Sequence, residues 1–257
     1  MSKQLVFPFN PIIWPAVPHD ETGESNLGFA TDDSTQRYTV GTRAMSWDGS
    51  VLRYAKWGSA NTSYQNGIWS NTTSAGVGFE SVNGASAVGD RTVNVADAST
   101  TLNQYAGGYL ILFHATGDGS VYTVIGNTVS AGGIVILTLD RPLAAAVTTS
   151  DNLELYESPF ADIRSGNSGN TKAFWGIPMA LMTSGNYGWI KTWGAIFIAP
   201  QSTVGGQGLA AGYFRHDGSI DVRGNISAAT VSDQYAGFRM IGSAAGDGPL
   251  FMLQVAI

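Results

Sequence analysis

The chain has 257 residues, a formal net charge of −6 and no cysteine, which excludes disulfides, thiolate metal sites and cysteine nucleophiles. Only 12% of its residues are charged, about half the share of an average globular domain. The acidic balance argues against nucleic-acid binding, which needs a basic surface. A surface of Ser, Thr, Asn and Gly favours burial against other proteins, because uncharged groups cost less to desolvate.

The first predicted segment is an extended N-terminal arm. Four prolines fall within residues 1–18, and each removes a backbone donor and restricts the residue before it. They also interrupt any signal-peptide core, and no apolar run is long enough to cross a bilayer. We therefore expect synthesis in the cytoplasm and no membrane partner. Large apolar side chains in the arm need a partner surface: Phe7, Phe9, Ile12, Ile13 and Trp14.

Strand signals dominate the rest of the chain. Short β-branched and aromatic runs alternate with Gly, Asn and Asp clusters. The predicted strands are 36–45, 50–57, 109–114, 120–125, 133–139, 174–182, 188–199, 209–215, 219–222 and 251–257. Asp-Gly pairs at 48–49, 118–119 and 217–218 predict hairpin turns. Single helical turns are compatible with 96–105 and 228–235.

These patterns predict an all-β protein made of β-sandwich or barrel-like units with an extended N-terminal arm. Three segments are expected. Residues 1–85 hold the arm and a β-hairpin region, 86–160 form a β unit that could be an insertion, and 161–257 form a C-terminal β unit. One five-residue pattern recurs, Asn-Gln-Tyr-Ala-Gly at 103–107 and Asp-Gln-Tyr-Ala-Gly at 233–237. It marks either equivalent corners of two similar units or a coincidence.

No catalytic pattern is found along the chain. The three histidines, at positions 19, 114 and 216, lack metal-ligand spacing. There is no nucleophile elbow. The Gly-rich run 205–212 precedes a predicted strand, so no helix N-terminus can hold a phosphate there. We therefore expect no enzyme activity, no cofactor and no metal. A polysaccharide-degrading enzyme remains an alternative, because paired carboxylates need not be adjacent in sequence.

Three aromatic residues form the one candidate binding group. Tyr187, Trp189 and Trp193 lie close together, and the two tryptophans share a face if this segment is one strand. Such rings can form an exposed platform that stacks on a sugar or a partner chain. The simpler interpretation is that they fill the core of a β unit.

Several sequence segments are more specific than these general strand and turn patterns. They are Gln-Tyr-Ala-Gly-Gly-Tyr at 104–109, the stretch Thr-Gly-Asp-Gly-Ser-Val-Tyr-Thr-Val-Ile-Gly-Asn-Thr at 116–128, and Leu-Thr-Leu-Asp-Arg-Pro-Leu at 137–143. The strand start Asn-Tyr-Gly-Trp at 186–189 and the segment 34–42 add to them. Together, over about 30–257, the chain resembles a family of tailed-bacteriophage virion structural proteins.

The resemblance implies a β-rich capsid decoration, or cement, protein on the outer surface of the icosahedral head. Its implied partners are the major capsid protein and sister subunits, in a homotrimer. The apolar arm would then contact the capsid or a neighbouring subunit. The alternative is a tail-fibre or spike module that recognises the host by binding surface carbohydrate, with the aromatic group as its platform.

Overall fold

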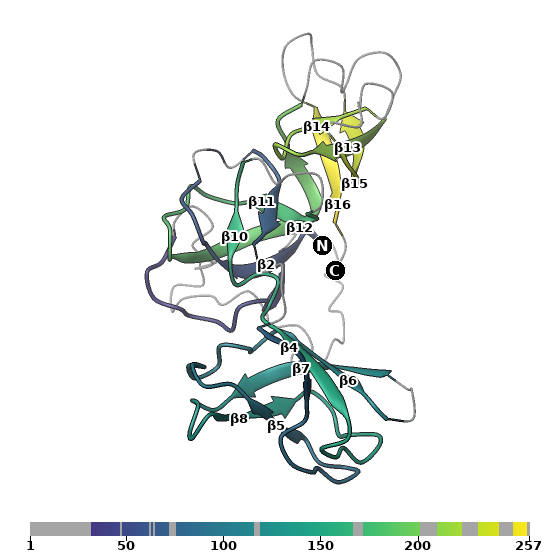
Figure 1. Cartoon of the computed structure of the whole chain (residues 1–257). Helices are drawn as coiled ribbons and strands as arrows, with labels where there is room; N and C mark the ends of the chain where they lie inside the picture. Colours follow the sequence, from purple (N-terminus) through teal and green to yellow (C-terminus); the bar gives the residue numbers. More distant parts are fainter. Residues whose placement is uncertain are drawn as a thin grey trace, which may run out of the picture. The chain divides into compact units, whose positions relative to one another are not determined.

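The computed structural model describes residues 32–46, 48–61, 63, 65–71, 76–115, 119–166, 172–200, 210–222, 231–241 and 249–255. These residues form sixteen β-strands and no helix (Figure 1), so the prediction of an all-β protein is confirmed. No helix is found among the described residues of 96–105 and 228–235, and residues 228–230 lie outside the described residues. Residues 102–107 form turns, and residues from 231 onward belong to a strand. The predicted N-terminal arm lies outside the described residues.

The chain divides into two compact units. Residues 37–41 and 70–163 form one of them, the inserted unit. Described residues within 32–36, 42–69 and 164–255 form the other, the split unit. The inserted unit begins before residue 86, where the sequence pattern placed its start, because β4 (Val77–Ser81) pairs with β9 (Asn152–Tyr156).

The inserted unit is a six-stranded antiparallel sheet that curls around one core (Figure 1). Its strand order is β4-β9-β6-β7-β8-β5. The remaining strands are β5 (Thr92–Ala96), β6 (Tyr109–Phe113), β7 (Gly119–Asn127) and β8 (Ile134–Leu139). Alternate residues of each strand point inward. The inward set includes Val93, Leu110, Leu137, Leu139 and Leu153, each of which is fully buried.

The split unit contains a ten-stranded sheet. Its strands before the insertion are β1 (Arg43–Met45), β2 (Val51–Lys56) and β3 (Ile68–Ser70), and β10 (Ile163–Arg164) lies where the chain returns. The others are β11 (Phe174–Pro178), β12 (Tyr187–Phe197), β13 (Ala211–Arg215), β14 (Ile220–Asp221), β15 (Val231–Ile241) and β16 (Leu250–Gln254). Their core includes Phe174, Ile198, Phe214, Phe251 and Leu253.

Two of the three Asp-Gly pairs lie at hairpin turns, and the glycine of the third begins a strand, while residues 116–118 lie outside the described residues. Gly49 adopts a φ of 78° between β1 and β2, and Gly218 adopts a φ of 82° between β13 and β14. A side chain at either position would be strained in this left-handed region. Gly119 is the first residue of β7, and it pairs with Phe113 at the end of β6. The predicted hairpin turns at 48–49 and 217–218 are therefore confirmed, and β6 and β7 pair as the third predicted hairpin requires.

Strand β12 organises the split unit. One edge pairs with β2 over residues 187–193. Lys191 pairs with both β2 and β11, and Trp193 pairs with both β2 and β16. Because a strand residue has one neighbour on each edge, β11 and β16 must follow one another along the edge opposite β2. The sheet therefore forks where β11 ends its pairing with β12 and β16 begins.

Candidate functional site

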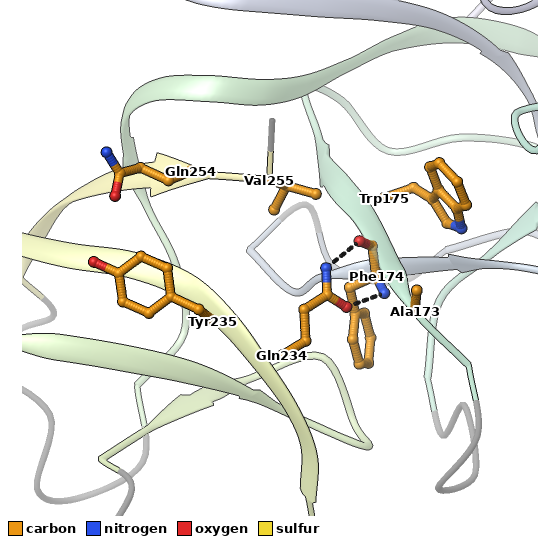
Figure 2. A pocket seen from close by; sticks show the side chains of 7 residues that line it. All are labelled: Ala173, Phe174, Trp175, Gln234, Tyr235, Gln254 and Val255. Carbon is orange, nitrogen blue, oxygen red and sulfur yellow. Dashed lines mark hydrogen bonds between the residues drawn. The ribbon is translucent and has the colours of Figure 1, made fainter. Parts of the chain in front are cut away.

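A pocket of about 250 Å³ lies at this fork. Its walls come from the start of β11, the middle of β15 and the end of β16 (Figure 2). The lining residues are Ala173, Phe174, Trp175, Gln234, Tyr235, Gln254 and Val255. None of the seven carries a charge, and three are aromatic. The pocket is thus an uncharged, partly aromatic depression in the surface of the split unit.

The Gln234 side chain completes the open edge of β11. Its amide oxygen accepts a hydrogen bond from the Phe174 backbone N–H at 2.6 Å, and its amide nitrogen donates to the Phe174 carbonyl oxygen at 2.7 Å (Figure 2). These two bonds reproduce the pattern that a neighbouring strand would make. At this position β12 pairs with β16 and no longer with β11. Gln234 therefore supplies the hydrogen-bond partners that the Phe174 backbone would otherwise lack.

Aromatic rings lie at the two ends of the pocket. Figure 2 shows Trp175 at one end and Tyr235 at the other, with Gln234 between them. The Tyr235 side chain is 39% exposed, and its ring meets that of Tyr213 edge to face at 5.6 Å between centroids. This contact fixes the Tyr235 ring while leaving part of its surface open to a ligand.

Gln254 is the second polar side chain of the lining. It lies at the Tyr235 end of the pocket (Figure 2). Within the described residues the Gln254 amide makes no hydrogen bond, unlike that of Gln234. An amide offers two donors and an acceptor, so Gln254 can exchange hydrogen bonds with a polar ligand at this end.

The predicted aromatic platform does not form around Trp189. This side chain is only 5% exposed, and its ring packs edge to face on Tyr54 at 5.2 Å between centroids. Tyr187 stacks on the same Tyr54 ring at 6.0 Å, and both Tyr187 and Trp193 are partly buried. Tyr54 comes from β2, opposite Trp189 in the ladder. A cross-strand partner that the local pattern did not reveal therefore buries Trp189.

The extra residue in β12 also separates the two tryptophans. The register between β12 and β2 shifts between Lys191 and Trp193, which is the mark of a β-bulge. A bulge breaks the strict alternation of faces, so four-residue spacing no longer places Trp189 and Trp193 on one face. The five candidate contact residues of the arm, Phe7, Phe9, Ile12, Ile13 and Trp14, lie outside the described residues.

Two carboxylates in the described ranges are held in place by several hydrogen bonds. Asp151 is buried, and backbone N–H groups of Thr148 and Ala115 donate to it at 2.7 and 2.8 Å. These bonds lower the pKa of Asp151, and His114 lies 3.6 Å away. No group of three His, Cys, Asp or Glu side chains that could hold a metal is found among the residues described.

The β1–β2 hairpin contains a second fixed carboxylate. Burial alone would raise the pKa of Asp48, but hydrogen bonds from Ser46 and Ser50 and the nearby charge of Lys191 outweigh it and lower the pKa to about 2. The ammonium of Lys191 lies 3.9 Å from Asp48 and donates to the Ala195 carbonyl oxygen at 2.8 Å. Burial lowers the pKa of Lys191. This set holds the hairpin against β12 and leaves no open site.

Several large apolar side chains lie among polar ones on the outward side of the inserted sheet. Leu110 and Leu112 point into the core, so their neighbours in β6 point outward. The Phe79 and Phe113 rings meet there at 5.2 Å between centroids. We call this side the inserted-unit face. Its large apolar side chains are between 36 and 61% exposed: Phe79, Tyr109, Val121, Ile125, Ile134 and Ile136.

The split unit has a comparable surface across β12, β16 and β15. One row of this sheet runs from Phe238 through Met252 to Ala195, opposite the side on which Phe251 and Leu253 enter the core. We call this side the split-unit face. Its large apolar side chains are between 38 and 63% exposed: Phe197, Tyr235, Phe238, Met240, Ile241 and Leu250.

No model of a known protein family matches this chain, and no curated protein matches its sequence. In the part of the chain that the structure describes, no helix is long and apolar enough to span a membrane.

Proposed function

We propose that this chain is a structural protein of a tailed-phage virion, a decoration protein that binds the outer surface of the icosahedral head and stabilises it. The observation that carries the proposal is the pair of apolar sheet faces, one in each unit. Antiparallel sheets commonly keep a polar side toward water. Here each unit also exposes several large aromatic and aliphatic side chains on its sheet, as do surfaces that become buried against other proteins.

The composition supports the same proposal. A protein that coats a shell needs no catalytic centre, and it must bury a large area against the major capsid protein and sister subunits. Only 12% of the residues are charged, so little charge has to be desolvated in such contacts. Repetition over the shell then stabilises it through many weak contacts. The resemblance of 104–109, 116–128 and 137–143 to phage virion proteins points in the same direction.

The face contacts can be tested by adding the purified chain back to heads that lack it. A variant with Ile125→Lys and Ile136→Lys places two charges on the inserted-unit face, where both side chains are exposed. We expect its occupancy on heads, measured by co-sedimentation, to fall at least tenfold (about 1.4 kcal/mol). A matched control, Val129→Lys, changes an exposed residue in the loop after β7 and should bind normally. Equal binding of all three proteins would contradict a role for this face.

The arm is tested separately by deleting residues 2–18. This deletion removes the candidate contact residues Phe7, Phe9, Ile12, Ile13 and Trp14. If the arm reaches a neighbouring subunit or the capsid, occupancy on heads should fall while the fold is retained, because no described strand is lost. Unchanged occupancy would remove the arm from the proposal and leave the sheet faces as the contact surfaces.

A tail-fibre or spike module that binds surface carbohydrate is the second candidate function. The fork pocket favours it, because the described residues that line it combine aromatic rings with amide groups and carry no charge. Location separates the two candidates. A decoration protein is present on the head lattice in copy numbers comparable with those of the shell protein, whereas a recognition module is confined to the tail or a vertex.

A further inference from the structure

We propose that, before assembly, the N-terminal arm of residues 1–18 binds the split-unit face of its own chain. This inference goes beyond the decoration role, because it concerns the chain before it meets a head. It depends on the apolar rows of that face, on the point where the arm is tethered, and on the length of the tether.

Two neighbouring rows of the split-unit face consist of apolar residues across β12, β16 and β15. The ladder partners are Ala195, Met252 and Phe238 in one row and Phe197, Leu250 and Ile241 in the next. The four at the ends of these rows and in Leu250 are between 38 and 63% exposed: Phe197, Phe238, Leu250 and Ile241. Monomeric proteins rarely leave large contiguous apolar patches open to water, so we expect this face to be covered.

The arm has the composition that such a face requires. Half of residues 1–18 are large and apolar, and Lys3 carries the only charged side chain among them. Prolines at 8, 11, 15 and 18 restrict the backbone, so less entropy is lost on binding. Pro-rich segments commonly bind surfaces lined by aromatic rings, and the face offers the rings of Phe197 and Phe238.

The chain that follows the arm is fixed to the split unit at Asp32 and Asp33. The Asp33 backbone exchanges two hydrogen bonds with that of Tyr187, at 2.8 and 2.9 Å. The Asp32 carboxylate accepts bonds from the Thr183 backbone N–H at 2.6 Å and from the Asn186 amide at 2.8 Å. Because the Asp33–Tyr187 bridge is antiparallel, the step from Asp33 back to Asp32 runs along β12 from its first residue toward its last. The arm is therefore tethered to the unit that carries the face.

The tether is long enough to reach the face. β12 has eleven residues, so Tyr187 and Phe197 are at most about 34 Å apart. Residues 19–31, which connect the arm to Asp32, span up to about 43 Å when extended. A tethered segment has an effective concentration on the order of millimolar, so a weak contact is sufficient and a second copy competes poorly in dilute solution.

This contact would cover two apolar surfaces of the unassembled chain at once. On a head, the arm could be exchanged onto a neighbouring copy through the same surfaces, as happens in domain swapping. That exchange rests on the proposed function, whereas the contact within one chain does not.

The experiment uses the purified full chain, which contains no cysteine. Asn10→Cys places one thiol in the middle of the arm, and a benzophenone maleimide attached to this thiol is activated by light. Peptide mass spectrometry then maps the adducts. We expect most of them on the parts of β12, β15 and β16 that form the split-unit face. Adducts mainly on the inserted unit, or spread evenly over the chain, would overturn the inference.

A mixture of equal amounts of ¹⁵N-labelled and unlabelled chains distinguishes the chain's own arm from that of a second copy. A contact within one chain joins peptides of the same isotope composition, and we expect these adducts to dominate. If adducts between labelled and unlabelled peptides were equally abundant, the occupant would be a second copy and the proposal would be wrong.

A charge on the face should release the arm. Ile241→Lys changes a side chain that is 63% exposed, and we expect the adduct yield on the split-unit face to fall about fivefold (about 1 kcal/mol). Ile125→Lys is the matched control, because Ile125 is 55% exposed on the inserted-unit face, and it should leave the yield unchanged. Circular dichroism verifies that both variants are folded.

Equal yields from the two lysine variants would contradict the assigned contact. All of these measurements are made without heads, whereas the decoration role is judged by occupancy on heads. Failure of one proposal is therefore distinguishable from failure of the other.

Discussion

The inserted unit and the split unit differ in how their strands are paired around an apolar core. Both enclose an apolar core with antiparallel strands. In the inserted unit, each of the four inner strands pairs with one neighbour on each side. In the split unit, β12 is eleven residues long and shares one edge between β11 and β16. The inner strands of the inserted sheet keep one partner strand on each edge, with register shifts in two pairings of the sheet, whereas the fork leaves a gap that the Gln234 side chain completes.

The comparison suggests where binding sites arise in such folds. A regular sheet presents a continuous face, and its function lies in what that face packs against. A forked sheet separates two strands, and the side chains around the gap can hold a small ligand. The following predictions test this contrast, beginning with the largest expected effect.

The core of the regular unit should be the most sensitive to truncation. Leu137 is fully buried in β8, and its neighbour Ile136 points outward with 41% exposure. We expect Leu137→Ala to lower the free energy of unfolding by about 2–5 kcal/mol. Ile136→Ala should lower it by less than about 1 kcal/mol. Urea denaturation measures both, and similar losses for the two variants would contradict the assigned faces of the sheet.

The stability of the fork should depend on the Gln234 side chain. Gln234→Leu removes both partners of the Phe174 backbone, and we expect a loss of about 1–3 kcal/mol in unfolding free energy. Gln254→Leu is the matched control, since its amide bonds to no other described residue, and it should be nearly neutral. Hydrogen exchange gives the direct measurement. The Phe174 amide should exchange faster in Gln234→Leu only, and slow exchange in that variant would exclude the strand-completing role.

The β1–β2 hairpin lies on the other edge of β12. The contribution of its Asp48 to stability should fall at acid pH. The pKa of Asp48 is lowered from 3.8 to about 2 in the folded state, so its contribution is complete above pH 3.8 and is lost as the pH falls toward 2. Because the side chain is 55% exposed, screening limits this contribution to about 1 kcal/mol or less. Comparing the unfolding free energies of wild type and Asp48→Asn gives the measurement. Their difference should be larger at pH 5 than at pH 2, and a constant difference would contradict the assignment.

The smallest effects on stability should come from the two exposed faces. Phe238→Ser in the split unit and Val121→Ser in the inserted unit replace side chains that are 38 and 51% exposed. We expect changes of about 0.5 kcal/mol or less in the isolated chain, measured by thermal unfolding. A large loss in either variant would mean that the face is part of the folded core and has no free surface to offer a partner.

Local patterns in the sequence predicted the strands with clear alternation. Residues 109–114 and 133–139 were predicted as strands, and β6 and β8 occupy nearly the same positions. The Asp-Gly pairs at 48–49 and 217–218 predicted their turns because glycine tolerates the left-handed conformation. The prediction missed six of the described strands, namely β3, β4, β5, β9, β10 and β15. β4 has one buried residue followed by four exposed ones, so it shows little alternation. β9 (Asn152–Tyr156) does alternate, and that signal could have been used.

The recurring five-residue pattern shows the limit of local sequence. At 103–107 it forms turns ahead of β6, whereas at 233–237 it lies within β15. Tyr105 is almost fully buried, and Tyr235 is 39% exposed at the pocket. The same residue types therefore occupy different environments at the two places. The recurrence of the pattern is better interpreted as a coincidence than as equivalent corners of two similar units. The surrounding sheet decides the outcome, as it does for many short segments.

The pocket itself had no signal in the sequence. Gln234 and Phe174 are sixty positions apart, and their contact depends on the fork in β12 pairing. The sequence pattern pointed instead to Trp189, which lies in the same long strand but is buried by Tyr54. Aromatic clustering in a sequence identifies bulky residues, but cross-strand register decides which of them remain on the surface.

The most direct test of the decoration role is the copy number of this chain relative to the major shell protein in purified virions, measured by quantitative peptide mass spectrometry. The proposal predicts a simple ratio to the shell protein, as expected for a subunit that repeats over the head lattice. A chain present at only a few copies per particle would contradict decoration. That result would place it on the tail or at a vertex, where recognition of surface carbohydrate would become its leading proposed function.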